Sequence, residues 1–415
     1  MSKKDKLSTE AYKGVRDFYP EDQAFFNYLC HACQSVAERF GYAEYHASIL
    51  EPAELYKAKG AESEEIVNEQ TYTFVDRGGR EVTLRPEMTP TVARMVAAKR
   101  RELGFPLRLF SIPNVFRYER PQRGRLREHW QLNVDIFGSR SLSADAEVIA
   151  VAHALMLQLG AKESDFTIKL GSRAFIDELA KKYSLAPDVA KLFTQLLDRR
   201  AKMPAEEFEE KLSELGIPNE ALSPADLPSD VGEIISLLKE SGVTNAEFDP
   251  SIVRGFNYYT GVVFEIFDTH PENNRALFGG GRYDNLTELF DDEPLPGVGF
   301  GMGDVTIQNF LELRGLKPAY VSAATLYLAT ASPEALPHTT AMAEELRKNN
   351  INVAVDFGEK KLGEQIKTAA KQHIPYLMVV GADEIASGNF VARNLDTGEE
   401  TKLTQNEIVS FFNNN

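Results

Sequence analysis

The sequence has little of several features that mark particular classes of protein. It contains only two cysteines and one tryptophan in 415 residues. No apolar run approaches the roughly 18–20 residues that a membrane-spanning helix requires. The N-terminal segment is charged and has no apolar core behind it, so it does not resemble a secretory signal. These absences argue against a secreted or membrane-embedded protein, and we predict a cytoplasmic location with no membrane partner.

The two cysteines form a Cys30-x-x-Cys33 pair, a spacing found in redox and zinc sites. The segment around them, 21–41, repeats apolar residues at helical spacing. A structural zinc site normally needs four ligands, and the chain has no second cysteine pair. We therefore predict that the pair packs in the core along an amphipathic helix. We predict no metal site built from protein ligands alone.

The chain carries an excess of acidic residues, with a formal net charge of −16. This balance argues against a protein that coats nucleic acid non-specifically. One window is inverted, since ten Lys or Arg residues and only two acidic residues lie between Arg94 and Arg127. We interpret Lys99–Arg101 as a solvated face and the rest as an anion site. A tRNA partner is compatible with this pattern, because only the docking surface needs to be basic.

The length predicts two or three domains. Residues 13–161 mix a long helix with strand-like segments, including a hairpin with its turn at 76–79. Residues 173–248 are helical, charged and interrupted by prolines, which indicates an inserted helical subdomain. After a linker at 318–323, alternating strands and helices predict a compact α/β domain with a mainly parallel sheet.

The segment 114–138 is the most informative part of the chain. Two strands of period 2 flank a loop that contains proline and glycine, so we expect an antiparallel hairpin with one apolar face. The other face would carry Arg117, Glu119, Gln131 and Asp135. A water-exposed sheet face is the simpler interpretation. However, a fixed guanidinium suits phosphate and a carboxylate suits an ammonium group, as an amino acid and a nucleotide would require.

Further segments supply polar or glycine-rich turns. Residues 85–89 place a carboxylate and a hydroxyl after a strand, and 254–261 place an arginine and two tyrosines before one; each by itself indicates a turn. Residues 279–284 and 297–303 are glycine-rich, but neither has the spacing of a Rossmann fold. The chain has no Walker lysine, no Ser-His-Asp or Cys-His pattern and no run of metal ligands.

Together these segments resemble the histidyl-tRNA synthetases, a class II aminoacyl-tRNA synthetase family. Residues 117–125 (RYERPQRGR) resemble the class II motif 2 hairpin in its histidine-specific form. Residues 254–261 (RGFNYYTG) and 280–284 (GGRYD) resemble two segments peculiar to this family. Residues 13–17 (KGVRD) resemble its N-terminal entry, and 361–363 (KLG) with the final α/β region resemble its anticodon-binding domain. The resemblance runs nearly from end to end.

The resemblance implies an α+β catalytic domain, with the antiparallel class II synthetase sheet and its helices, over 1–172 and 246–320. It implies a helical insertion over 173–245 and an α/β anticodon-binding domain over 324–415. The implied activity is that of a histidine–tRNA ligase, which uses ATP and Mg²⁺ to form histidyl-adenylate and loads tRNA(His). A homodimer is also implied.

The resemblance assigns roles to individual residues. Arg117 and Arg254 are the implied catalytic residues. ATP would be bound by Arg117 at the α-phosphate, Glu119 at the adenine edge, Arg125 at the pyrophosphate end, and Arg275. Histidine would be bound by Glu87, Thr89, Gln131, Asp135, Arg254, Tyr258 and Tyr259. The tRNA acceptor end would meet Arg120, Gln122 and Arg123.

The sequence departs from the family pattern in places. Thr306 stands where class II enzymes usually carry the motif 3 arginine, and Arg275 is a candidate substitute. Asp135 stands where many members carry glutamate, and Asn133 replaces a common glycine.

Two alternatives to an active ligase remain open. One is a tRNA-binding module without catalysis. The other is the histidine-sensing regulatory paralogue of ATP phosphoribosyltransferase, which lacks the anticodon-binding region and tends to lose the segment that contains Arg254. We favour the active ligase, because a chain without catalysis would have little reason to keep Glu87, Arg117, Gln131 and Arg254 together.

Overall fold

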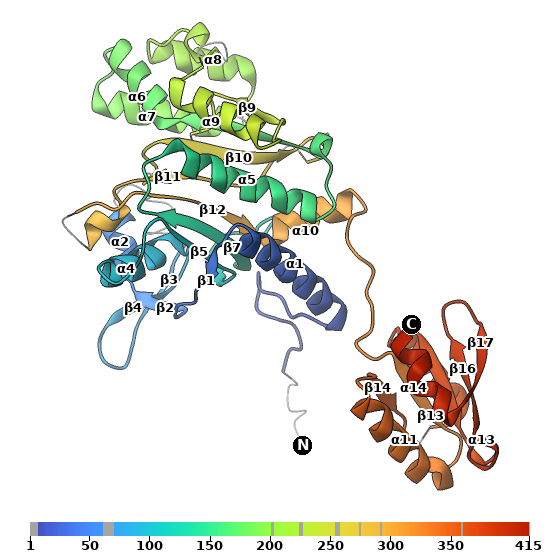
Figure 1. The fold of residues 1–415 in the computed structure, drawn as a ribbon. Coiled ribbons are helices and arrows are strands. Elements are labelled where there is room, and N and C mark those ends of the chain that lie inside the picture. The colour runs from blue at the N-terminus through green and yellow to red at the C-terminus, as the bar shows by residue number, and fades with distance from the viewer. Residues whose placement is uncertain are drawn as a thin grey trace. The chain divides into compact units, whose positions relative to one another are not determined.

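The computed structural model describes residues 7–60, 70–200, 203–223, 227–253, 258–273, 275–290, 293–357 and 360–414 (Figure 1). The chain divides into two compact units. One contains Met1–Phe18 and Phe26–Lys317, and the other contains Tyr19–Phe25 and Pro318–Asn415. Within the described ranges, no helix is both long enough and apolar enough to span a membrane.

The larger unit is built on a mostly antiparallel sheet. Nine of its described strands join in the order β1-β5-β7-β12-β11-β10-β8-β9, with β6 paired to β7. The strands are β1 (Ala43–Glu44), β5 (Leu107–Ser111), β6 (Asn114–Phe116), β7 (Glu128–Phe137), β8 (Phe166–Ser172), β9 (Ala246–Phe248), β10 (Val262–Asp268), β11 (Ala276–Tyr283) and β12 (Gly297–Gly303). Among these strands the pairs β1–β5 and β8–β9 are parallel and the others antiparallel, which confirms the predicted sheet.

The alternation predicted for β7 gives the sheet two different faces. Leu132, Val134 and Ile136 are buried, and with the apolar residues of β12 they pack under helices. These helices are α1 (Pro20–Arg39), α5 (Leu142–Gln158) and α10 (Asp304–Leu313) (Figure 1). Because successive side chains point to opposite faces, Gln131, Asn133 and Asp135 all lie on the other face.

Glycines keep this second face clear. Along β12, Gly299 pairs with Asp135 and Gly301 pairs with Asn133. A Cβ atom at Gly299 would lie 2.2 Å from Asp135 Oδ1, and one at Gly301 would lie 2.3 Å from Gln131 Nε2. The Gly-x-Gly-x-Gly pattern therefore provides a floor for the polar side chains of β7, while the residues between the glycines fill the core.

A smaller sheet, in the order β2-β4-β3, carries the predicted hairpin. Its strands are β2 (Leu50–Pro52), β3 (Tyr72–Val75) and β4 (Glu81–Leu84), and the helices beside it are α2 (Glu54–Gly60) and α4 (Thr89–Lys99). Asp76 Oδ1 accepts hydrogen bonds from the backbone N–H groups of Gly78 and Arg80, and Gly79 has a φ of 78°. The predicted turn at 76–79 is confirmed.

The region 173–248 is helical, as predicted, and it joins the main sheet through β8 and β9. Its helices are α6 (Arg173–Lys182), α7 (Pro187–Arg199), α8 (Ala205–Glu214) and α9 (Ser229–Glu240), with a short 3₁₀ turn at Asn219–Leu222; another 3₁₀ turn, Glu163–Asp165, precedes β8. Pro187 opens α7, and Pro204 and Pro228 precede α8 and α9, because a proline lacks the N–H that a helix interior needs. Phe193, Leu197 and Leu212 are buried in a core of this region.

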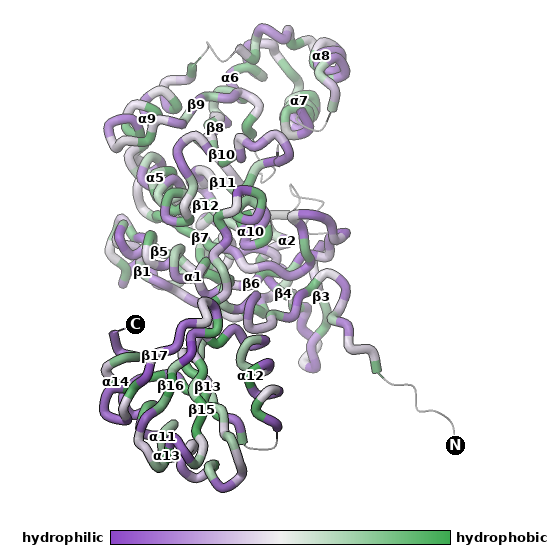
Figure 2. The backbone as a smooth tube through the Cα atoms, turned by 90° about the vertical axis from the view of Figure 1, so that its right-hand side faces the viewer, coloured by the Kyte–Doolittle hydropathy of each residue, from purple (hydrophilic) through white to green (hydrophobic). Residues whose placement is uncertain are grey.

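The smaller unit is an α/β structure with a sheet ordered β14-β13-β15-β16-β17. Its strands are β13 (Leu326–Thr330), β14 (Val353–Val355), β15 (Tyr376–Val380), β16 (Asn389–Asn394) and β17 (Glu400–Thr404); its helices are α11 (Leu336–Lys348), α12 (Leu362–Lys371), α13 (Ala382–Ser387) and α14 (Gln405–Asn414). The strands β13 and β15 are strongly apolar (Figure 2). They are parallel, as predicted, whereas β16 and β17 add two antiparallel pairings. The sequence pattern does not predict β17, because Leu403 is its single buried residue.

Candidate active site

Two tyrosines and a carboxylate meet beside the glycine-lined face. The hydroxyl of Tyr258 donates to Glu87 Oε2 at 3.1 Å, and the hydroxyl of Tyr56 donates to the backbone oxygen of Glu87 at 3.1 Å. The ring of Tyr258 lies 4.8 Å from that of Tyr259 and 5.9 Å from that of Tyr283, centroid to centroid. Tyr258 therefore joins Glu87 to a cluster of three aromatic rings, and this brings together Glu87, Tyr258 and Tyr259, which the sequence predicts for histidine binding.

A buried arginine holds the turn that presents Glu87. The guanidinium of Arg85 donates to the backbone oxygens of Asn114 (2.9 Å) and Ala47 (2.8 Å), and only 1% of Arg85 is exposed. Burial lowers its pKa. Thr89 begins α4 two residues after Glu87, so the turn is anchored at both ends. The sequence pattern assigns Arg85 no role, because a single arginine before a proline gives no sign that its side chain is buried.

Asp135 is a buried carboxyl group with one free oxygen. The hydroxyl of Tyr283 donates to its Oδ1, whereas its Oδ2 has no hydrogen-bond partner. Burial raises the pKa of Asp135 to about 7, and the bond from Tyr283 lowers it in part. On the same face, Gln131 Oε1 is also buried without a partner, and Asn133 donates its side-chain N–H to the Gln131 backbone oxygen at 2.9 Å.

The predicted hairpin continues this face toward a basic loop. β6 ends at Phe116, so Arg117 and Glu119 lie just past the strand and not within it. Arg117 Nε donates to the Pro86 backbone oxygen at 2.9 Å, which joins this hairpin to the turn of Glu87. Arg125 Nη1 lies 3.5 Å from Glu119 Oε2. The loop therefore brings three of the predicted nucleotide-binding residues to one end of the site.

His129 is an uncharged imidazole next to this loop. Burial and the positive charges of Arg117 and Arg16 lower its pKa to about 3. Arg16 in turn forms an ion pair with Asp304 at 2.5 Å, and Asp304 Oδ1 accepts the Trp130 backbone N–H at 3.0 Å. The 13–17 segment is therefore fixed to the point where β12 passes into α10.

Thr306 lies in the first turn of α10. Its hydroxyl donates to backbone oxygens of β11 and of Gly303, the residue before this helix. Its acceptors are the backbone oxygens of Leu277 at 2.8 Å and Gly303 at 3.0 Å. A Cβ atom added at Gly124 would lie 3.7 Å from the Thr306 methyl group, so the hairpin loop approaches this position closely. Arg275 is exposed and precedes β11, two residues from Leu277. Among the described residues, no hydrogen bond or ion pair joins Arg275 to Glu119 or Arg125.

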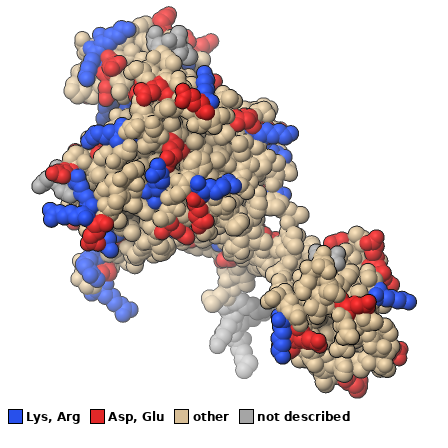
Figure 3. All heavy atoms as spheres, viewed as in Figure 1, with Lys and Arg blue, Asp and Glu red and all other residues tan. Residues whose placement is uncertain are grey.

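The three residues predicted for the tRNA acceptor end lie in the exposed part of the loop. Arg120, Gln122 and Arg123 are exposed, and Gln122 and Arg125 exchange backbone hydrogen bonds around the tip. In Figure 3, Lys and Arg side chains alternate with Asp and Glu over the visible face, without a wide area of one sign. Arg254, one of the two predicted catalytic residues, lies outside the described residues.

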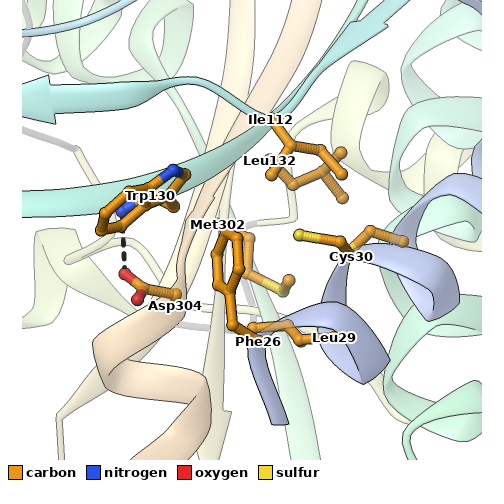
Figure 4. Close-up of a pocket in the computed structure, with 9 residues that line it drawn as sticks. Phe26, Leu29, Cys30, Ile112, Trp130, Leu132, Met302 and Asp304 are labelled. Atoms are coloured by element: carbon orange, nitrogen blue, oxygen red, sulfur yellow. Dashed lines mark hydrogen bonds between the residues drawn. The ribbon is translucent and has the colours of Figure 1, made fainter. Parts of the chain in front are cut away.

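The opposite face of the sheet contains a small, mostly apolar pocket. Phe26, Cys30, Trp130 and Met302 line it, with the hydrogen bond from the Trp130 backbone to Asp304 at its rim (Figure 4). Cys33 is 2% exposed, and burial raises the pKa of the Cys30 thiol to about 11. The predicted packing of this pair along α1 is confirmed.

Comparison with known proteins identifies the family. A model described as histidyl-tRNA synthetase matches residues 14–307, and one described as anticodon binding domain matches residues 325–415. The histidine–tRNA ligase of Leptospira biflexa is 42% identical over 430 residues, which cover 98% of each chain. That of Thermoplasma volcanium is 35% identical and covers 98% of this chain and 99% of its own.

Solved structures agree with these sequence relatives. The histidyl-tRNA synthetase of Nostoc sp. PCC 7120 matches with a TM-score of 0.83 and 22% identity, over 99% of this chain and 100% of that one. A protein from Bacillus halodurans C, described as an ATP phosphoribosyltransferase regulatory subunit/histidyl-tRNA synthetase, matches with a TM-score of 0.73 and 23% identity, over 91% of this chain and 100% of that one. At these identities the structures support the fold alone. Through its sequence relatives and the two family models, the chain belongs to the histidyl-tRNA synthetase family.

Proposed function

We propose that the chain is a histidine–tRNA ligase, which activates L-histidine with ATP and transfers it to the 3′ end of tRNA(His). One observation carries the proposal: two carboxylates, each held by a tyrosine hydroxyl, share the glycine-lined side of the site. Glu87 accepts from Tyr258, and Asp135 accepts from Tyr283. Histidine has two groups that need such acceptors, its ammonium group and a ring N–H.

The amino acid would lie with its two ends at these carboxylates. Glu87, Thr89 and Gln131 would receive the ammonium group, and Asp135 would accept the ring N–H between the rings of Tyr258 and Tyr259. Asp135 is 2% exposed and has an oxygen without a partner, so a neutral ring with one N–H suits it better than a fully charged side chain.

ATP would lie along the hairpin. Arg117 would hold the α-phosphate, Glu119 the adenine edge, and Arg125 the pyrophosphate end. The 3.5 Å contact between Arg125 and Glu119 must then open as the nucleotide enters. Arg275 would supply the cation that position 306 lacks, since Thr306 is uncharged and its hydroxyl donates to backbone oxygens.

Activation would proceed by in-line displacement. A carboxylate oxygen of histidine forms a bond to the α-phosphorus while the bond to the bridging oxygen breaks, and pyrophosphate leaves with that electron pair. Arg117 and Arg254 would stabilise the charge on the α-phosphate. No covalent bond to the protein forms, so catalysis depends on positioning and on fixed positive charge.

Mg²⁺ would accompany the nucleotide. Such ions are usually held by substrate phosphates and by one or two carboxylates. No group of three or more His, Cys, Asp and Glu side chains suited to a metal ion occurs in the described part of the chain. Glu265 pairs with Gly279 across β10 and β11, which puts it on the glycine-lined face. The single carboxylate of Glu265 fits an ion that is carried mainly by ATP. The positive charge of this ion would offset the negative charge of the phosphates.

Transfer to tRNA would use the exposed loop and the smaller unit. Arg120, Gln122 and Arg123 would meet the acceptor end, and the domain matched over 325–415 would meet the anticodon. We also propose a homodimer, a cytoplasmic location and the domain limits 1–172 with 246–320, 173–245 and 324–415. The core of the helical region around Phe193 and Leu212 supports its treatment as an insertion.

The alternative is a histidine sensor on the same fold, as in the regulatory paralogue of ATP phosphoribosyltransferase. The description of the Bacillus halodurans C protein names both activities, and Thr306 weakens the usual nucleotide clamp. Against it, the chain has the C-terminal region matched as an anticodon binding domain.

The deciding experiment is histidine-dependent exchange of labelled pyrophosphate into ATP, with Mg²⁺ and without tRNA. We expect exchange in the wild type and its loss in Arg254→Ala. If exchange is absent while histidine still raises the melting temperature, the chain is a sensor and the proposed activity is wrong.

A further inference from the structure

Two hydroxyl groups at the edge of the main sheet face the site. The backbone N–H of Tyr45 donates to the Phe110 oxygen at 2.9 Å, which continues the parallel register of β1 with β5. Tyr45 therefore lies level with Ser111, and Ser111 pairs with Asn133 on β7. Paired residues point to the same face, so Tyr45 and Ser111 share the face of Asp135.

Buried polar atoms without partners are concentrated here. Among the described residues, eight buried side-chain nitrogen or oxygen atoms have no hydrogen-bond partner. Four of them are on this face: Tyr45 Oη, Ser111 Oγ, Gln131 Oε1 and Asp135 Oδ2. Buried polar groups are nearly always paired in native proteins. Four exceptions from two strands, β5 and β7, and from the residue after β1 indicate that a polar group completes their hydrogen bonds.

Electrostatic coupling supports their proximity. Burial and the charge of Asp135 raise the pKa of the Tyr45 hydroxyl, and nearby Ser111 lowers it in part. Burial raises the pKa of Tyr283, and Asp135 and Tyr45 raise it further. Although Tyr45 and Ser111 are neighbours, the geometry between their hydroxyls does not form a hydrogen bond. Both groups remain able to donate.

We propose that Tyr45, supported by Ser111, determines the specificity of the amino-acid site by donating its hydroxyl to the second ring nitrogen of the bound histidine. Asp135 Oδ2 accepts the ring N–H, so each nitrogen of the neutral imidazole forms one hydrogen bond with the protein. A ring without the second nitrogen would leave the buried Tyr45 hydroxyl unpaired, and sites of this kind reject such analogues strongly. This inference rests on the proposed function.

The test uses the full chain and the variant Tyr45→Phe in histidine-dependent pyrophosphate exchange. The ligands are histidine and the two pyrrolylalanines, which keep one ring N–H and replace the other nitrogen with carbon. Loss of one neutral hydrogen bond should raise the KM for histidine about tenfold and leave the KM for ATP unchanged. The ratio of the analogue Ki to the histidine KM should fall by a similar factor.

Tyr42→Phe is the matched control. Tyr42 is 3% exposed, and its hydroxyl donates to Glu147 Oε1 at 3.3 Å. We expect Tyr42→Phe to lower the melting temperature and leave the KM for histidine unchanged. Tyr45→Phe should hold or raise the melting temperature of the free protein, because it removes an unsatisfied group. A purely structural role for Tyr45 would give the reverse pattern.

An unchanged KM and an unchanged ratio in Tyr45→Phe would overturn the inference and leave water as the occupant of these atoms. If that variant does not fold, Ser111→Ala provides the test. We expect a smaller rise in the KM for histidine and the same fall in the ratio of the analogue Ki to the histidine KM. Absence of histidine-dependent exchange in the wild type would instead refute the proposed function, so the two failures are distinguishable.

Discussion

Asp135 combines a carboxyl group with almost complete burial, and this sets a pH dependence. Its pKa is about 7 in the folded protein against an ordinary value of 3.8. Between these values the unfolded chain has lost the proton and the folded one keeps it. The contribution of Asp135 to stability should therefore fall by about 1 kcal/mol per pH unit from about pH 4 to 7, and level off above pH 7.

Melting temperatures of the wild type and Asp135→Asn across this range provide the measurement. The asparagine variant should lack the fall between pH 4 and 7. Tyr283→Phe should extend the fall to higher pH without changing where it begins, because it removes the bond that lowers the pKa of Asp135 in the folded protein. Parallel pH profiles for the wild type and Asp135→Asn would contradict this assignment.

Arg117 is fixed by one nitrogen, Nε, at the Pro86 backbone oxygen. Its remaining nitrogens can therefore be directed at a phosphate without a search through rotamers. Arg117→Ala should reduce the rate of histidine-dependent exchange by roughly 10²–10³, as loss of one fixed donor does elsewhere. Histidine should still raise the melting temperature of the variant. A rate within a few-fold of the wild type would show that Arg117 does not act on the α-phosphate.

At the scale of the element, β12 is defined by its glycines. Gly299→Ala would place a Cβ 2.2 Å from Asp135 Oδ1 and 2.5 Å from the Val134 backbone oxygen, so β7 and β12 must separate. We expect a loss of stability of about 1–3 kcal/mol and a large rise in the KM for histidine. Denaturant unfolding and exchange assays measure the two effects.

Gly104→Ala is the control for this substitution, because nothing lies within 4 Å of its added Cβ. It should change neither quantity. An unchanged KM for histidine in Gly299→Ala would mean that the glycine-lined face is not the floor of the amino-acid site.

At the scale of the whole molecule, a net charge of −16 opposes tRNA, so its docking depends on few cations. Arg123→Glu should raise the KM for tRNA in aminoacylation. It should also reduce the slope of log KM against log salt by about one, as loss of a single phosphate contact does. Exchange without tRNA should be unaffected. Arg101→Glu is the control, since Arg101 belongs to the segment interpreted as a solvated face.

Equal effects of Arg123→Glu and Arg101→Glu on the KM for tRNA would indicate long-range charge alone. A fall in pyrophosphate exchange in Arg123→Glu would instead place this arginine at the nucleotide.

Much of this organisation could be predicted from local pattern. The period of 2 in 128–137 assigned Gln131 and Asp135 to one face, and prolines divided the helical region 173–248 into separate segments. Both signals act within a few residues along the chain, so one sequence is enough to detect them. The resemblance to a family added the roles of residues such as Glu87 and Arg117.

The tertiary structure alone decided which side chains meet. Tyr283 reaches Asp135 from a strand 148 positions later, and Tyr45 becomes level with Ser111 through β1, a strand of two residues. The burial that raises the pKa of Asp135 and leaves its Oδ2 unpaired also arises only when β5, β7, β12 and β11 assemble. Local patterns fix the face on which a side chain lies, whereas partners and desolvation depend on long-range register, which no short segment encodes.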